Sequence, residues 1–114
     1  MSVEIHIRRL HRYDDLSAAL AGLPDTLNID AAFIISEIGS LMPAVLRFVG
    51  AKTGTVVHSD TEILSLSGAL ARNESGGSHI RMAVYDQNDA VFGGHLMVWS
   101  MVRATAEIVI GSAP

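Results

Sequence analysis

Residues 78–96, SHIRMAVYDQNDAVFGGHL, place the strongest constraint on how this chain can fold. Alternation along the first half puts His79 and Arg81 on one face of an extended segment and apolar side chains on the other, which is typical of a half-buried strand. The polar run at residues 86–89 favours a tight turn, since Asn and Asp tolerate left-handed backbone angles. The segment therefore predicts an antiparallel β-hairpin.

The return strand of this hairpin contains the sequence Gly93-Gly94-His95. Two glycines inside a strand indicate a β-bulge or the close approach of another backbone, and either feature would redirect His95. His79, Arg81 and His95 are therefore the candidate site residues of the chain.

Length and composition indicate one domain over residues 1–114 that associates with copies of itself. Of the 114 residues, 49% are hydrophobic and 18% are charged, against roughly 25% charged in typical soluble domains. A monomer of this size buries only about two-thirds of its unfolded surface. Burial of apolar side chains between subunits resolves this conflict, so we expect a homo-oligomer.

Several classes of protein are disfavoured by the same composition. Cysteine is absent, so neither disulfides nor thiolate metal sites can form. The longest apolar runs, residues 31–35 and 96–99, are far shorter than the roughly 20 residues of a membrane span. The N-terminal residues lack the continuous apolar core of a signal peptide. We expect a cytoplasmic protein that does not contact membranes.

The charge pattern disfavours a general DNA-coating role. The formal net charge is −4, and only Arg8, Arg9 and Arg12 cluster in the sequence. Nucleic-acid binding relies on clustered basic side chains that release phosphate counterions. An exposed basic connection or a contact with an anion are the two interpretations of this cluster.

Periodicity predicts six or seven strands and one helix, hence an α/β (α+β) fold. The helix begins near Tyr13 and ends at Gly22 and Pro24. The predicted strands, apart from the two of the hairpin, cover residues 3–7, 30–38, 44–49, 60–68 and 97–110, and the short segment 56–58 is predicted to pair back across a turn at residues 51–55. A turn at Gly39-Ser40 ends the second of them.

Glu37 is unusual because it lies in an apolar strand. An unpaired buried carboxylate costs several kcal/mol, so this side chain needs a partner or a cavity. An interfacial salt bridge, a role in ligand binding and simple exposure are all compatible with the sequence.

Three motifs together resemble the PPC domain, the "plants and prokaryotes conserved" domain. They are residues 62–68 (EILSLSG), residues 91–96 (VFGGHL) and residues 38–40 (IGS), and the resemblance extends over residues 3–110. It implies a mainly antiparallel sheet of about seven strands with one or two flanking helices, assembled as a homotrimer. The Arg-Gly-Arg-Pro core with which plant members bind DNA is absent.

The resemblance also implies a metal site in some members, formed by a His-x-His strand and the Gly-Gly-His motif. Here His79 and His95 match two of those positions, and zinc accepts such a set of nitrogens. Arg81 stands where the second histidine would be, and a guanidinium cannot ligate a metal. Zinc binding by His79 and His95, aided by His58, Glu37 or a second subunit, is therefore one of several interpretations.

Two classes of function remain open. The first is a non-catalytic homotrimeric interaction module of the PPC type, linked to transcription or DNA binding. The second is a protein, either a binding protein or an enzyme, that binds a small molecule, an anion or zinc through His79, Arg81, His95 and Glu37 near subunit interfaces. No motif in the sequence supplies a catalytic nucleophile.

Overall fold

A single eight-stranded sheet dominates the computed structural model, which describes residues 2–113 apart from the side chain of Ser75. The strand order is β1-β8-β2-β5-β6-β7-β3-β4, and every neighbouring pair is antiparallel. The strands are β1 (Glu4–His11), β2 (Ala31–Leu41), β3 (Ala44–Arg47), β4 (Thr55–Val57), β5 (Thr61–Ala71), β6 (His79–Asp86), β7 (Val91–Leu96) and β8 (Val102–Ser112). The mainly antiparallel fold is confirmed, with one strand more than predicted.

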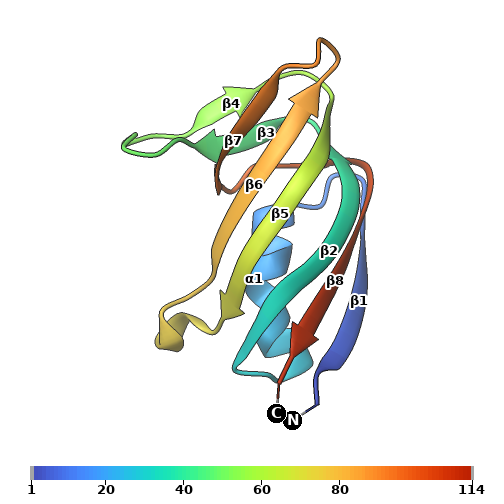
Figure 1. Ribbon diagram of the computed structural model, residues 1–114, viewed down its shortest axis with the longest axis vertical. Helices are drawn as coiled ribbons and strands as arrows, with labels where there is room; N and C mark the ends of the chain where they lie inside the picture. The colour runs from blue at the N-terminus through green and yellow to red at the C-terminus, as the bar shows by residue number, and fades with distance from the viewer. Residues whose placement is uncertain (1, 114) are drawn as a thin grey trace.

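Helix α1 (Leu16–Leu27) covers one face of the sheet and leaves the other face open (Figure 1). The helix buries Leu16, Leu20 and Leu23 against the sheet. Strand β6 follows the predicted alternation, with Ile80, Met82 and Val84 buried and the residues between them more exposed. We refer to the uncovered side as the open face.

No helix in the described part of the chain is long and apolar enough to span a membrane.

The ends of the helix are fixed by contacts with distant parts of the chain. Asp15 caps the N-terminus by accepting hydrogen bonds from the N–H groups of Ala18 (3.1 Å) and Trp99 (2.7 Å). The prediction that the helix ends at Gly22 and Pro24 is wrong, because it continues to Leu27. Asn28 then ends it in the left-handed conformation, with φ of 54°.

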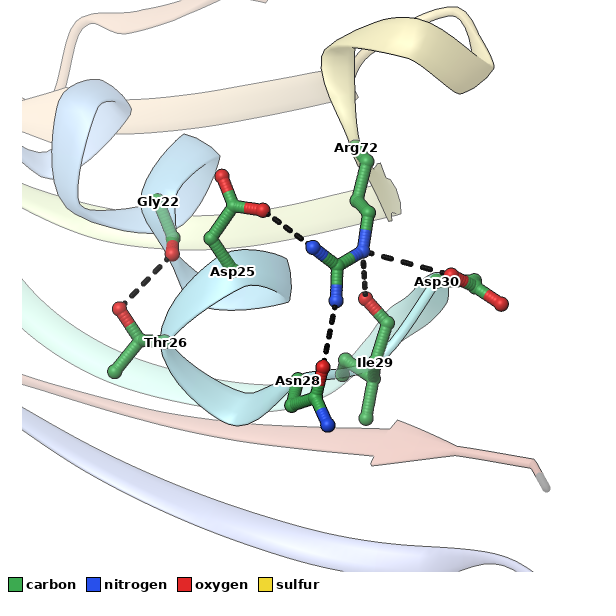
Figure 2. Close-up of polar contacts among 7 residues, drawn as sticks. All are labelled: Gly22, Asp25, Thr26, Asn28, Ile29, Asp30 and Arg72. Atoms are coloured by element: carbon green, nitrogen blue, oxygen red, sulfur yellow. Dashed lines mark hydrogen bonds and ion pairs between the residues drawn. The ribbon is translucent and has the colours of Figure 1, made fainter.

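Arg72, which follows β5, holds the C-terminal end of the helix (Figure 2). Its Nε–H donates to the carbonyl oxygen of Ile29 (3.1 Å), and its two terminal nitrogens donate to Asp25 (2.6 Å) and Asn28 (3.1 Å). A planar guanidinium can serve three acceptors at once, and a lysine cannot reproduce this geometry. These bonds help explain why the helix passes Pro24.

The change Arg72→Ala is expected to lower the free energy of unfolding by about 1–2 kcal/mol, because the helix end loses its hydrogen bonds to β5. Urea denaturation followed by circular dichroism measures the difference. Arg12→Ala is the matched control, since the Arg12 guanidinium only lies over the Tyr13 ring, 5.0 Å from its centroid. Equal effects of the two substitutions would contradict the anchoring role of Arg72.

Several predicted strand boundaries are wrong. Strands β1, β5 and β8 continue past their predicted ends to His11, Ala71 and Ser112. Two further boundaries are wrong for a tertiary reason. Strand β2 does not end before Gly39-Ser40 but continues through it, because Gly39 allows β8 to approach: a Cβ there would lie 2.7 Å from the Cβ of Ala106. The predicted strand at residues 97–110 begins only at Val102. Before it, buried Ser100 accepts a hydrogen bond from the N–H of Val45 (2.9 Å) and holds the connection from β7.

The first and last strands are neighbours. Glu4 pairs with Ser112 and His11 with Thr105, so the whole of β1 lies along β8. The two ends of the chain consequently meet at the same end of the molecule (Figure 1).

Candidate functional site

The hairpin of β6 and β7 brings Arg81 and His95 directly opposite each other on the open face. The two residues are register partners, and facing residues of antiparallel strands project on the same side. His79 precedes Arg81 by two residues and is exposed on the same face. The structure therefore places three of the four predicted site residues on one face of the sheet.

A hollow of about 470 Å³ lies beside this pair, lined by Val49, Arg81, Gly93, Gly94 and His95. The two glycines do not form a bulge, because the register between β6 and β7 is regular. Gly94 instead permits the second predicted alternative, close approach of another backbone: a Cβ there would lie 2.7 Å from the carbonyl oxygen of Arg47. Gly94 therefore lets β3 pack against β7.

The lining of the hollow contains one arginine and no carboxylate. Among the described residues, the ion pairs are formed by Arg9, Arg72 and Arg103, and Arg81 takes part in none of them. The nearest carboxylates along the β5–β6 ladder are Glu62 and Asp86, at the opposite end of the hairpin. An anion could therefore approach Arg81 without meeting a carboxylate on these strands.

Glu37 is not part of this cluster. It pairs with buried Ile108 of β8, which places its side chain toward the side covered by the helix. Strands β2 and β5 are in register at Ala31–Phe33 and at Ser40–Leu41, and Glu37 lies between these two stretches. There its carboxylate accepts a hydrogen bond from the backbone N–H of Leu66. By accepting this hydrogen bond, Glu37 of β2 connects its strand to β5. Glu37 forms none of the ion pairs of the described residues.

Burial raises the pKa of the Glu37 carboxyl above its ordinary value of 4.5, and the Leu66 hydrogen bond opposes the shift. A raised folded-state pKa means that the ionised form destabilises the native state at neutral pH. This penalty disappears as the pH falls through the folded-state pKa to below the unfolded value.

The change Glu37→Gln is accordingly expected to raise the urea midpoint at pH 7, because an amide oxygen still accepts from Leu66 without carrying charge. The difference from the unmodified chain should shrink at pH 4, where the carboxyl in both states is largely protonated. Denaturation at the two pH values and one protein concentration tests this. A Gln variant that is less stable at pH 7 would contradict the assigned direction of the pKa.

The whole chain matches a known protein family. The model of the Plants and Prokaryotes Conserved (PCC) domain, also abbreviated PPC, matches residues 1–114. The chain belongs to this family. Among curated proteins it is similar to the bifunctional protein GlmU of a Synechococcus strain, with 34% identity over 113 residues. That match covers 99% of this chain and only 17% of the relative.

Solved structures agree with the PPC fold. A hypothetical protein from Salmonella enterica is 31% identical, with a TM-score of 0.92 and coverage of 99% of this chain and 80% of the other. A metal-containing protein from Archaeoglobus fulgidus (24% identity, TM-score 0.77, coverage 95% and 78%) shares the fold. So does a candidate DNA-binding protein from Bacteroides thetaiotaomicron (21% identity, TM-score 0.78, coverage 96% and 81%).

The residues of one PPC protomer do not fit the three-nitrogen zinc set that the family resemblance implies. His79 and His95 lie diagonally across the β6–β7 ladder, and Arg81 occupies the position between them. No group of three or more His, Cys, Asp or Glu side chains that could hold a metal is found among residues 2–113. The metal interpretation therefore needs a ligand from another subunit.

The basic cluster of the sequence is dispersed in space. Arg9 lies on the open face and pairs with Glu107 (2.7 Å), whereas Arg8 points to the opposite side of the same strand. Arg12 lies over the ring of Tyr13. These three arginines therefore do not form one surface along which a phosphate backbone could run.

Sequence reasoning missed Arg47 and Arg72 as residues of interest. Arg47 of β3 is the register partner of His95, so it lies on the open face, one strand beyond His95. Alternation after Pro43 predicts that Arg47 points away from Leu46, and this is the only signal that the sequence offers. The pairing of β3 with β7 is not evident in the sequence.

Proposed function

We propose that this PPC domain is a non-catalytic homotrimeric binding module that assembles through the apolar half of its open face. The observation that carries the proposal is a group of exposed aliphatic and aromatic side chains where β1, β8 and β2 lie together. This apolar patch consists of Val3, Ile5, Ile7, Phe33 and Ile35, whose residues are 44% to 63% exposed.

The patch is contiguous because Gly111 lies beneath it. A Cβ at Gly111 would meet the side chains of Phe33 (2.9 Å), Ile35 (3.0 Å) and Val3 (3.0 Å), so these three side chains converge over the glycine. Ile5 is the register partner of Gly111, and Ile7 follows on the same face. Exposed patches of this kind mark interaction sites, since burial yields about 25 cal/mol for each Å² of apolar surface removed from water.

The proposed partner is a second and third copy of this chain. The domain is rich in apolar residues and poor in charge, and the family resemblance implies three subunits. A surface of mixed aliphatic and aromatic character is also suited to self-association by a closed rotational symmetry. A role connected with transcription would run through protein partners, because the arginines do not form a DNA-binding surface.

Native mass spectrometry of tag-free protein, purified without chelator, tests the assembly. A mass of three chains is expected. A monomer at micromolar concentration would overturn the proposed trimer, and an added zinc mass on each subunit would favour the metal interpretation.

A second candidate function is the binding of an anionic small molecule at Arg81 and His95. The specific support is the hollow beside these residues, together with the lack of a described carboxylate paired with Arg81. A guanidinium binds carboxylate or phosphate oxygens through two parallel hydrogen bonds, and the imidazole can add a third. The apolar and electropositive halves of the open face would then serve assembly and ligand binding separately.

A further inference from the structure

The electropositive half of the open face contains one continuous row of side chains across three strands. Arg81 of β6 faces His95 of β7, and His95 in turn faces Arg47 of β3. Neighbouring strands lie about 4.8 Å apart, so the Cα atoms of the two arginines are roughly 10 Å apart with an imidazole between them. The sequence alone does not indicate this row.

Arg47 has hydrogen-bonding capacity that the protein itself does not use. Its only described side-chain contact is a long hydrogen bond of 3.4 Å from Nη1–H to the carbonyl oxygen of Ala51. The side chain is half-buried, and it forms none of the ion pairs of the described chain. A guanidinium carries five donors, and a partly desolvated charge without a counterion is costly. The remaining donors are available to an external anion.

The space next to the row suits a ligand. Gly93 and Gly94 carry no side chains on the stretch of β7 that leads to His95, and the hollow is lined by Arg81 and His95. Arg47 is not part of the lining, but its register with His95 places its side chain on the same face, one strand beyond His95. Exposed Val49 completes the lining with an apolar surface.

We propose that Arg81 and Arg47 hold two separate anionic groups of one ligand, with His95 between them as a shared hydrogen-bonding group. The ligand is a small molecule with two phosphate or carboxylate groups. This inference rests on the second candidate function, anion binding at Arg81 and His95, and adds to it the second anchor and the class of ligand.

Isothermal titration calorimetry on the assembled protein at low salt tests the inference with three probes: orthophosphate, pyrophosphate and glutarate. Pyrophosphate is expected to bind at least about tenfold more tightly than orthophosphate, the usual gain from one further charge-assisted contact. If glutarate binds as tightly as pyrophosphate, the ligand is a dicarboxylate. If glutarate binds more weakly, the ligand carries phosphate groups. Both outcomes support two anionic groups.

Variants assign the two anchors. Arg47→Ala should remove the preference for pyrophosphate and leave orthophosphate affinity within about twofold, whereas Arg81→Ala should abolish both. Arg103→Ala removes the same charge from an arginine that pairs with Asp60 (3.8 Å), and it should change neither affinity. Arg47→Lys, which keeps the charge and loses the fork, covers the case in which Arg47→Ala fails to fold.

The negative outcomes separate the two proposals. Orthophosphate binding that depends on Arg81, with no gain for pyrophosphate and no effect of Arg47→Ala, overturns the second anchor and leaves the anion site intact. Equal loss of orthophosphate in both variants also overturns it, since both arginines would then hold one anion. Failure of every anion to bind refutes the anion site itself.

Discussion

Replacing Gly68 with alanine is expected to lower the free energy of unfolding by about 3 kcal/mol or more, a larger loss than that expected for Arg72→Ala. Gly68 lies in β5 opposite Ile80, with φ of +142°, a conformation that side chains rarely adopt. A Cβ there would overlap the carbonyl oxygen of His79 and lie 3.0 Å from the Cα of Ile80. These are backbone atoms of a paired strand, so they cannot move without breaking the β5–β6 ladder.

Urea denaturation of Gly68→Ala beside Gly22→Ala measures this effect. Gly22 lies inside helix α1, with no positive φ and no neighbouring atom within 4 Å of the position that a methyl group would occupy. Alanine there should stabilise the chain by up to about 1 kcal/mol, since glycine is a poor helix former. Similar changes for the two variants would contradict the steric explanation. The local damage should also disturb His79, whose carbonyl is the obstructing group.

The second large effect concerns assembly. Ile7→Asp is expected to dissociate the proposed trimer to monomers. The isoleucine is 63% exposed in the single chain, and the variant would place a carboxylate within the proposed interface. An unpaired buried charge costs several kcal/mol, and about 3 kcal/mol already weakens association by more than a hundredfold. The protomer itself should keep its fold, since the side chain projects from the open face.

Light scattering coupled to size-exclusion chromatography reports the subunit number, and circular dichroism verifies that the variant is folded. Val98→Asp is the control. Val98 is similarly exposed, at 51%, but it lies on the connection between β7 and β8, outside the apolar patch. If Val98→Asp dissociates the assembly and Ile7→Asp does not, the interface lies elsewhere and the proposed use of the open face is wrong.

Much of the sheet could be predicted because its signals are local. The alternation of β6 and the polar turn at residues 86–89 determine the hairpin without help from the rest of the chain. The wrong helix end and the wrong start of β8 depend on distant partners. The helix passes Pro24 with its end held by Arg72, which is more than 40 residues away, and Ser100 holds the break between β7 and β8. No local pattern contains these contacts.

The candidate site divides in the same way. Arg81 and His95 could be associated from sequence because the hairpin that joins them is short. Arg47 could not, because its position beside His95 depends on β3 packing against β7 at Gly94. A charge within an apolar run makes Glu37 a candidate site residue by sequence. In the structure Glu37 accepts a hydrogen bond from Leu66 where two strands lose register, and no sequence pattern predicts this contact.

The pairing of Glu4 with Ser112 has a consequence for modular architecture. A polypeptide that enters and leaves a domain at one place can be joined to other domains, or inserted within one, without stretching the sheet. The Synechococcus relatives, of which this chain matches only 17% and 18%, are several times longer than the domain. In Figure 1 both chain ends lie at the bottom, whereas β3, β4 and β7 lie at the top. A fused neighbour would thus be tethered at the end of the molecule remote from β3 and β7, the strands that lie beside the proposed anion site.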